Sequence, residues 1–290
     1  MSVVTAGAVP IQHKVSRVTA DHGSHNLTAG EEESLNRYYR AHERYEAMRM
    51  LHRYEDSKLT TALPLSGKRV LELGCGSLPI LLATPEAAFT YVGTDLSENG
   101  VRLAKGLAPR GHFVVCDATA PPLFSKHFDI IVMKNLLHHI ERPESCLRAV
   151  QHLLAPGGVV VVMEPNSTCV VANVAKVLLN LVRRKLEESP YGQLPVSRLR
   201  EAFLATGFEV VERRHSGLLA FPLSGDYGSL RLMPMSVSLW RAIIALDRLL
   251  SGLLLSTNSR LAPRLSFKVT FYLKPKQCAE PSSPVAAHKA

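Results

Sequence analysis

The sequence predicts an α/β protein built on a doubly wound, mostly parallel sheet of seven strands. Two observations carry this prediction. Short apolar runs rich in Val and Ile alternate with helix-like segments, and repeated strand-then-helix units produce right-handed crossovers with helices on both faces of a sheet. The runs also show little alternation of polar and apolar residues, which is typical of parallel strands covered on both faces.

The individual elements follow from periodicity and from turn residues. Strands are expected at 69–73, 90–94, 111–116, 128–133, 158–164, 208–213 and 266–273. Helices are expected at 79–83, 98–107, 143–154, 170–186 and 196–205. The strand at 266–273 is placed by its alternation of apolar and polar residues.

The segments outside this pattern have characters of their own. The helical stretch from residue 31 carries Tyr38, Tyr39, Tyr45 and Tyr54, half of the eight tyrosines, and either packs on the core or covers a pocket. The predicted organisation is a mobile arm (1–30), an N-terminal helical lid (31–66), a core (67–215 and 265–275), a helical insertion that caps the substrate pocket (216–264) and a disordered tail (276–290).

The insertion before the last strand is amphipathic. Its leucines, Trp240 and Ile243 recur at helical spacing, and Arg241 and Arg248 interrupt them. Such a helix can cap a pocket for a lipophilic acceptor, pack on a second subunit or lie on a membrane surface, and we favour these in that order.

The charge distribution and the cysteines indicate possible partners and the redox compartment. The net charge is +9, and residues 213–276 hold ten basic residues against two acidic ones, either as a solvated face or as a contact for an anionic partner such as a phosphorylated substrate or a membrane. The five cysteines include no C-x-x-C pair, which argues against disulfides and zinc and favours a reducing compartment. Since neither a signal-like leader nor a run of roughly 18 apolar residues is present, we expect a cytoplasmic protein.

The candidate binding residues lie where the strands end. Ligands of a doubly wound sheet bind at the carboxyl ends of its strands, which selects Gly74 to Gly76, Asp95, Asp117 and the segment 135–139. Two glycines after a strand allow a ligand to approach the backbone closely. The dinucleotide pattern G-x-G-x-x-G has Pro79 in place of its third glycine, and no G-K-[ST] follows, so a dinucleotide site and a phosphate-binding P-loop are both disfavoured.

Two aspartates complete an adenosine-like site. Asp95 follows Gly76 by nineteen residues and can accept hydrogen bonds from both ribose hydroxyls, although an Asp there could also cap the next helix. Asp117 can accept a hydrogen bond from an exocyclic amine such as that of adenine, or it can serve as a turn residue. Together the aspartates predict a pocket for an adenosyl ligand that lacks a pyrophosphate.

Residues 69–166 resemble the core of class I S-adenosylmethionine-dependent methyltransferases, and within them the small-molecule subgroup that includes quinone-biosynthesis enzymes. The resemblance rests on Glu72-Leu73-Gly74-Cys75-Gly76, on Phe128-Asp129-Ile130-Ile131, on Asn135-Leu136-Leu137-His138-His139 and on Leu154-Ala155-Pro156-Gly157-Gly158, which occur in the family's order. One departure is Leu78, where the family often has a third glycine.

The resemblance implies a Rossmann-like fold, S-adenosylmethionine as the cofactor and a role for each matching residue. By this comparison Glu72 supports the methionine amino end, and the backbone of Gly74, Cys75 and Gly76 contacts the cofactor. The remaining positions are Asp95 at the ribose, Asp117 at the adenine, and Asn135 and Leu136 near the sulfur, and the neighbouring Leu96 and Ala118 are also expected to bind the cofactor.

The chemistry itself requires little beyond alignment of the reactants, because a sulfonium methyl is already activated. A hydroxyl or carbon acceptor benefits from a general base, and His138 and His139 are the candidates, with local packing as their alternative role. Glu164 and Asn166 are further candidates for touching the acceptor. We expect a small lipophilic acceptor, with oxygen favoured over carbon or nitrogen.

Other functions remain open at this point. A nucleic-acid base is not the expected acceptor, because the Asn/Asp-Pro-Pro-aromatic signature of such enzymes is replaced by Asn135-Leu136-Leu137-His138. The rival interpretations are a cyclase that uses the same fold without methyl transfer and a non-catalytic cofactor-binding partner protein.

Overall fold

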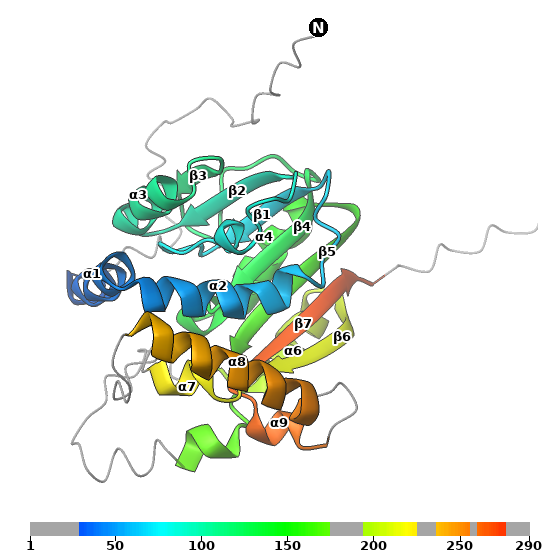
Figure 1. Cartoon of the computed structure of the whole chain (residues 1–290). Helices are drawn as coiled ribbons and strands as arrows, with labels where there is room; N and C mark the ends of the chain where they lie inside the picture. Colours follow the sequence, from blue (N-terminus) through cyan, green and yellow to red (C-terminus); the bar gives the residue numbers. More distant parts are fainter. Residues whose placement is uncertain (1–28, 175–193, 225–235, 256–259, 277–290) are drawn as a thin grey trace, which may run out of the picture.

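The computed structural model describes residues 29–174, 194–224, 236–255 and 260–276. Its centre is a seven-stranded sheet in the order β3-β2-β1-β4-β5-β7-β6 (Figure 1). The strands are β1 (Arg69–Leu73), β2 (Thr90–Asp95), β3 (His112–Val115), β4 (Phe128–Lys134), β5 (Leu154–Pro165), β6 (Phe208–Ser216) and β7 (Lys268–Pro275). The seven-stranded, doubly wound prediction is confirmed.

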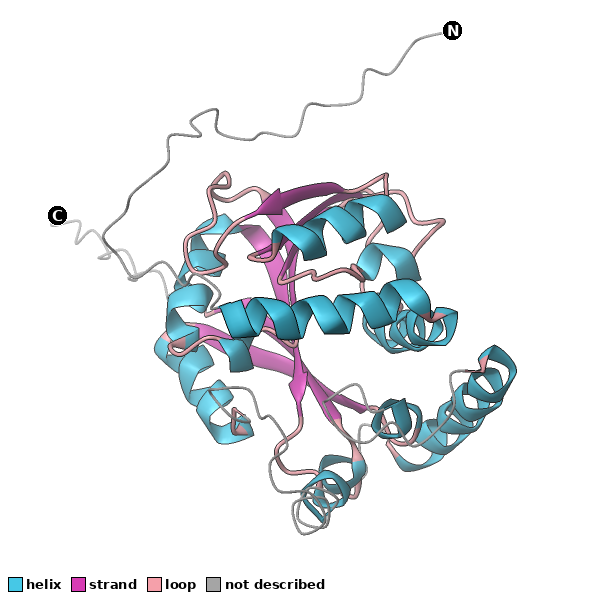
Figure 2. Ribbon diagram, turned by 90° about the vertical axis from the view of Figure 1, so that its left-hand side faces the viewer, coloured by secondary structure: helices cyan, strands magenta, loops and turns pink. Residues whose placement is uncertain are grey.

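Neighbouring strands from β3 to β5 pair in parallel, and β7 pairs antiparallel with both β5 and β6. Helices cover both faces of this sheet (Figure 2). They are α3 (Glu98–Leu107), α4 (Pro143–Leu153) and α6 (Val196–Ala205), together with the N-terminal α1 (Ala29–Arg44) and α2 (Glu46–Thr60). Because β7 runs against its neighbours, the sheet is mostly parallel rather than wholly so.

Each face of the sheet has its own apolar layer. One layer joins alternate residues of the central strands, such as Leu71 and Ile131, to Leu147 of α4 and Phe203 of α6. The other layer holds the intervening strand residues, the end of α2 and the short 3₁₀ helix η1 (Ile80–Ala83). This alternation decides which face each strand residue addresses, including the polar residues near the strand ends.

The N-terminal helical segment is divided into α1 and α2 by an extended residue, Tyr45, with φ −112° and ψ 113°. Helix α2 buries nine of its fifteen residues and runs across the front of the sheet in Figure 1. It packs against α8 (Val237–Leu254) of the insertion, where Leu51 and Tyr54 meet Trp240 and Ile243 in an apolar cluster. The segment that we expected to be a lid therefore packs against the insertion.

The insertion consists, in its described part, of α7 (Ala220–Ser224), α8 (Val237–Leu254) and α9 (Ala262–Leu265). Buried Asp247 of α8 holds these parts together: its carboxylate accepts hydrogen bonds from Tyr54 Oη at 2.6 Å and from the amides of Leu219 and Ala220. The chain leaves β6 at Ser216 and re-enters β7 at Lys268, which pairs with Pro165 at the carboxyl end of β5. The insertion thus starts and ends at the edge of the sheet where parallel strands end.

Several predicted boundaries differ from the structure. β5 begins at Leu154, four residues early, because Leu154 already pairs with Phe128 before a register shift. The helix expected at 79–83 is a single 3₁₀ turn that begins after Pro79. Of the helix expected at 170–186, only 170–174 are described and helical, and the arm and the tail fall almost wholly outside the described residues. No helix in the described ranges is long and apolar enough to cross a membrane.

Candidate active site

The glycine loop directly follows β1 and contacts the segment after β4. Gly74 and Gly76 have φ values of +71° and +53°, a region that residues with a Cβ rarely adopt. A Cβ on Gly74 would lie 2.8 Å from Cδ1 of Leu136. The amide of Cys75 donates to the carbonyl of Thr94 at 2.9 Å, so β2 fixes the middle of the loop. The predicted site residues at the ends of β1 and β4 therefore lie together.

Asp95 closes β2 and anchors the glycine loop from the other side. Its Oδ2 accepts a hydrogen bond from the Gly76 amide at 2.8 Å, and its Oδ1 accepts one from the Ser97 amide at 2.9 Å. Burial raises the pKa of Asp95, and these amide donors counteract part of that rise. The N-cap of α3 is Ser97, which accepts from the Gly100 amide at 3.1 Å. The alternative role that we considered for Asp95, helix capping, is thus filled by a neighbour.

Asp117 lies two residues beyond β3 and shapes a turn. Its Oδ1 accepts hydrogen bonds from the amide and the hydroxyl of Thr119, at 2.7 and 2.8 Å. Its Oδ2 accepts none from any residue that the structure describes. Ala118 packs on the apolar layer. The turn role of Asp117 is therefore present, and one carboxylate oxygen stays available for a ligand.

Asn135, directly after β4, has a buried side-chain oxygen that a polar ligand could bind. Its φ is +52°, and its amide donates to the carbonyl of Met163 at 2.8 Å. Its side-chain Oδ1 is buried and has no hydrogen-bond partner among the described residues. Buried polar atoms are almost always paired, so an unpaired amide oxygen at the end of β4 is suited to a ligand's donor group.

A buried charge network, which the sequence did not predict, lies behind the loop. The Lys134 ammonium contacts both oxygens of Asp56, at 2.9 and 2.8 Å, and the Leu78 carbonyl at 3.2 Å. Glu72 Oε1 lies 3.8 Å from the same ammonium. Burial alone lowers the pKa of Lys134, but the two carboxylates outweigh it, and that pKa lies above its usual value. Lys134 thereby ties α2, β1 and the loop together.

Glu72 belongs to this network and is fully buried. Its Oε2 accepts a hydrogen bond from the Ile80 amide at 2.9 Å and another from the hydroxyl of Tyr91. Gly93 gives Tyr91 room, because a Cβ there would lie 2.9 Å from the Tyr91 hydroxyl. Burial raises the pKa of Glu72 to about 7. The Glu72 carboxylate thus accepts a hydrogen bond from the first amide of η1 and stabilises the loop from its buried side.

Tyr39 of α1 covers the loop from outside. Its ring would lie 3.7 Å from a Cβ on Gly76, and its hydroxyl 3.0 Å from a Cβ on Gly100. The side chain is buried, and burial together with the nearby Asp95 carboxylate raises the pKa of its phenol. A second contact comes from His42, whose Nδ1 lies 3.0 Å from Ser77 Oγ. The N-terminal segment thus has the position over the loop that a lid requires.

His138 is held by a carboxylate. Its Nδ1 lies 2.6 Å from Oε2 of Glu164, whose other oxygen accepts the amides of Leu136 and Leu137 at 3.0 and 2.7 Å. Because a carboxylate only accepts hydrogen bonds, this contact selects the tautomer of the neutral imidazole that has its proton on Nδ1 and its lone pair on Nε2. The His138 side chain is 11% exposed, while His139 is exposed and its ring centroid lies 4.0 Å from that of His138. Glu164 therefore orients one of the two predicted bases.

The two further acceptor-contact candidates have other roles. The Glu164 carboxylate is fully buried and occupied as described above. Asn166 is 2% exposed, and its Nδ2 donates to Pro263 and Ser266 of the insertion's end at 2.8 Å. Hydrogen bonds within the protein occupy both side chains, so their contact with the acceptor stays a prediction that this geometry does not favour.

Comparison with known proteins agrees with this arrangement. The family model described as "Methyltransferase domain" matches residues 39–213, so the chain belongs to that family. Among solved structures, a SAM-dependent methyltransferase from Thermotoga maritima has a TM-score of 0.53 at 15% identity and covers 84% of this chain and 98% of its own. A methyltransferase of Haloferax volcanii, solved with a methyltransferase activator, also has a TM-score of 0.53, at 16% identity, covering 86% and 97%.

The curated relatives that the chain resembles carry a more specific name. A "ubiquinone biosynthesis O-methyltransferase" from Caulobacter sp. (strain K31) is 32% identical over 128 residues, 42% of this chain and 50% of that protein. One of the same name from Sinorhizobium medicae is 27% identical over 173 residues, 57% and 68% of the two chains. The chain thus spans about half to two thirds of these relatives. The matched domain and the names of these relatives are both those of methyltransferases.

Proposed function

We propose that this protein transfers the methyl group of S-adenosylmethionine to a hydroxyl oxygen of a small, lipophilic acceptor, with His138 as the general base. The observation that carries the proposal is the contact between His138, in the segment after β4, and Glu164 at the end of β5. His138 lies near the Leu136 side chain that faces Gly74. An oriented imidazole suits a hydroxyl acceptor, which must lose its proton as the new bond to carbon forms.

The cofactor's place follows from the residues that fit it. We assign the loop backbone of Gly74, Cys75 and Gly76 to its amino-acid part, and Leu136 and the side-chain amide of Asn135 to the surroundings of its sulfur. Asp95 with Leu96 and Asp117 with Ala118 are assigned to the ribose and the adenine. Support comes from the positive φ of both glycines, the unpaired Asn135 oxygen and the available Asp117 oxygen. Glu72 has a supporting role, since its carboxylate is bonded to Ile80 and Tyr91 beneath the loop.

In this mechanism the chain aligns the reactants, excludes water and accepts a proton. S-adenosylmethionine supplies a methyl group that its positive sulfur already activates. The chain's buried loop and the Tyr39 cover hold the reactants aligned and exclude water, which is where most of the rate arises. His138 Nε2 accepts the acceptor's proton, and the Glu164 carboxylate stabilises the imidazolium that results. His139 is the alternative base.

The acceptor site is assigned to the insertion and the N-terminal helices. The insertion begins and ends beside the carboxyl end of β5, at the same edge as the glycine loop. Its apolar composition favours a lipophilic acceptor, and the names of the relatives favour oxygen as the accepting atom. We therefore propose residues 31–66 as the lid, 216–264 as the cap and 67–215 with 265–275 as the catalytic core.

The proposal is tested by methyl transfer to a panel of phenols and catechols with and without alkyl tails, followed by mass spectrometry. We expect methyl ethers, with higher kcat/KM for the alkylated acceptors. His138→Ala should lower kcat by about 10²-fold or more, the usual contribution of a general base, and leave cofactor affinity nearly unchanged.

His139→Ala is the matched control, because it removes the neighbouring and more exposed ring. Full turnover in the His138 variant would remove this residue from the mechanism, and a loss confined to the His139 variant would transfer the role to its neighbour. Cofactor binding without methyl transfer to any acceptor would favour the rival cyclase or the non-catalytic binding protein.

A further inference from the structure

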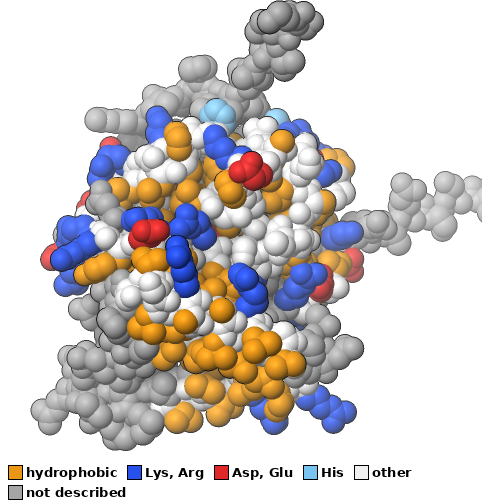
Figure 3. Space-filling view, viewed as in Figure 1, with side chains coloured by type: hydrophobic (Ala, Val, Ile, Leu, Met, Phe, Trp, Pro, Cys, Tyr) orange, Lys and Arg blue, Asp and Glu red, His pale blue; other side chains and the backbone are white. Residues whose placement is uncertain are grey.

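Helix α8 exposes a row of leucines to solvent. Leu246, Leu249 and Leu253 are 47%, 63% and 70% exposed, and their spacing of three and four residues puts them on one side of the helix. We call these three residues the leucine stripe. The opposite side of α8 is buried against α2, where Trp240 and Ile243 lie. Figure 3 shows hydrophobic side chains gathered over this part of the molecule, with basic side chains along their border.

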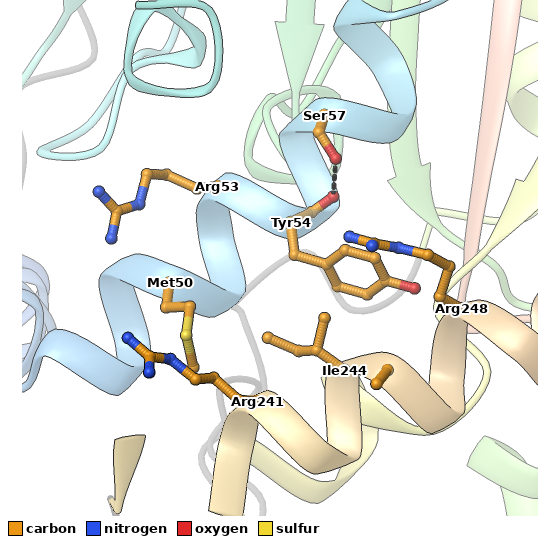
Figure 4. A pocket seen from close by; sticks show the side chains of 8 residues that line it. Met50, Arg53, Tyr54, Ser57, Arg241, Ile244 and Arg248 are labelled. Atoms are coloured by element: carbon orange, nitrogen blue, oxygen red, sulfur yellow. Dashed lines mark hydrogen bonds between the residues drawn. The ribbon is translucent and has the colours of Figure 1, made fainter. Parts of the chain in front are cut away.

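A basic hollow lies between α8 and α2, next to the leucine stripe. It has a volume of about 400 Å³ and is lined by Arg53, Arg241 and Arg248 together with Tyr54 (Figure 4). We call the three arginines the arginine cluster. The Arg248 guanidinium lies 5.5 Å from the centre of the Tyr54 ring, a cation–π contact. None of the three guanidiniums forms an ion pair with a carboxylate in the described part of the chain.

No acidic side chain is exposed in the described part of the insertion. In the described part of the insertion the one acidic residue is Asp247, which is fully buried and bonded to Tyr54, Lys58 and two backbone amides. Arg260 and Arg264 add two exposed positive charges near α9. The surface therefore combines exposed leucines with uncompensated positive charge.

We infer that α8 docks this protein on the surface of a membrane that contains anionic lipids. The leucine stripe enters the boundary between headgroups and acyl chains, and the arginine cluster binds lipid phosphates. Amphipathic helices with one apolar side and basic flanks lie in this interface, and their affinity rises with apolar area and with anionic lipid. The helix lies on the membrane and does not cross it, since its other side carries the contacts to α2.

A second copy of the chain fits this surface less well. In a symmetric dimer the same patch meets itself, so each arginine cluster would lie close to the other one. A bilayer with phosphate groups is complementary to both parts of the surface. The inference does not depend on the proposed reaction, because neither His138 nor the glycine loop takes part in docking.

The test is flotation of the full-length protein with lipid vesicles, in the absence of cofactor and acceptor. Vesicles of phosphatidylcholine alone are compared with vesicles of equal parts phosphatidylcholine and phosphatidylglycerol. We expect binding to the anionic vesicles that weakens as salt is added. The double variant Leu249→Ser/Leu253→Ser should bind about tenfold less tightly or weaker still. Arg241→Gln/Arg248→Gln should lose about tenfold and with it most of the preference for anionic lipid.

The matched controls lie on α6. Leu204→Ser removes a leucine that is 56% exposed, and Arg200→Gln removes an exposed arginine, so both should bind as the wild type does. Absence of wild-type binding to anionic vesicles would overturn the inference, as would equal binding by the α8 variants. A dimer seen in sedimentation and lost in the leucine variant, without vesicle binding, would assign the surface to a second copy.

Discussion

The buried ammonium of Lys134 offers the sharpest test of how the core supports the site, through the variant Lys134→Met. Methionine keeps much of the length of the side chain and removes its charge. The substitution leaves Asp56, 2% exposed, without the partner that lies 2.8 Å from its carboxylate, and it removes the donor to the Leu78 carbonyl. Removing one member of a buried ion pair typically costs about 3–5 kcal/mol.

We expect this loss in urea unfolding followed by circular dichroism. Since typical domains have a free energy of unfolding of about 5–15 kcal/mol, the variant should be folded but much weakened. Adding Asp56→Asn should restore a large part of the loss, because the unpaired charge is then gone. If Lys134→Met costs less than about 1 kcal/mol, as an exposed pair would, or if the two substitutions are additive, the network does not hold α2 to the loop.

Three further predictions concern the site. Gly74→Ala should lower S-adenosylmethionine affinity at least about tenfold in calorimetry, because φ is +71° and the new Cβ would lie 2.8 Å from Leu136. Glu72→Gln should alter the pH dependence of unfolding: the Glu72 pKa is raised to about 7, so its stabilising contribution is present below about pH 4.5 and is lost as pH rises through 7. The free energy of unfolding of the variant should therefore lack that decline. Glu164→Gln should lower kcat about 10²-fold, because an amide can donate to His138 Nδ1 and so reverse the tautomer.

The glycine variant has a matched control, and each of the three predictions has a result that would contradict it. Gly67→Ala introduces the same backbone strain, at φ +71°, where no atom lies within 4 Å of the new Cβ, so it should cost stability without affecting cofactor binding. Equal binding by both alanine variants would show that the loop does not need the close approach of Leu136. Parallel pH profiles of wild type and the Glu72 variant would mean that Glu72 does not titrate near neutrality. Undiminished kcat in the Glu164 variant would show that the orientation of His138 is immaterial.

The sequence predicts the sheet well because its signals are local. Each parallel strand contains a short apolar run, and a glycine or a polar residue closes or directly follows most of these strands. The boundaries of β1, α3 and α6 therefore agree with the structure. The beginning of β5 could not be predicted, because Ala155-Pro156-Gly157 has the composition of a turn, and only pairing with Phe128 draws Leu154 into the strand. The tertiary contact overrides the local preference there.

The sequence predicted the glycine loop and the aspartate at the end of β2, but it did not predict the buried ion pair behind the loop. Gly74, Gly76 and Asp95 follow their strands directly, and the structure brings them together. The Asp56–Lys134 pair joins residues that are 78 positions apart, which no local pattern reveals. A lysine that closes the apolar run of β4 was a signal, since a charge at such a position needs a buried partner.

The pairing of Glu164 with His138 is a second contact that spacing does not show. Both residues were noted as polar side chains at strand ends, and each was assigned separately to base or acceptor contact. Only the parallel register of β4 and β5 places the end of one strand beside the end of the other. The consequence is chemical, because the pair fixes which nitrogen of the imidazole can take a proton.

The central claim, that the glycine loop and the end of β2 form the S-adenosylmethionine site, is tested most directly by calorimetry on Asp95→Asn. We predict saturable binding to the wild type and a loss of about tenfold or more in the variant, the value of a lost charge-assisted hydrogen bond. Asp129→Asn is the control, since it makes the same change at the amino end of β4, where Asp129 binds Arg69 at 2.9 Å. Equal affinity in all three proteins, or no binding to the wild type, would contradict the account.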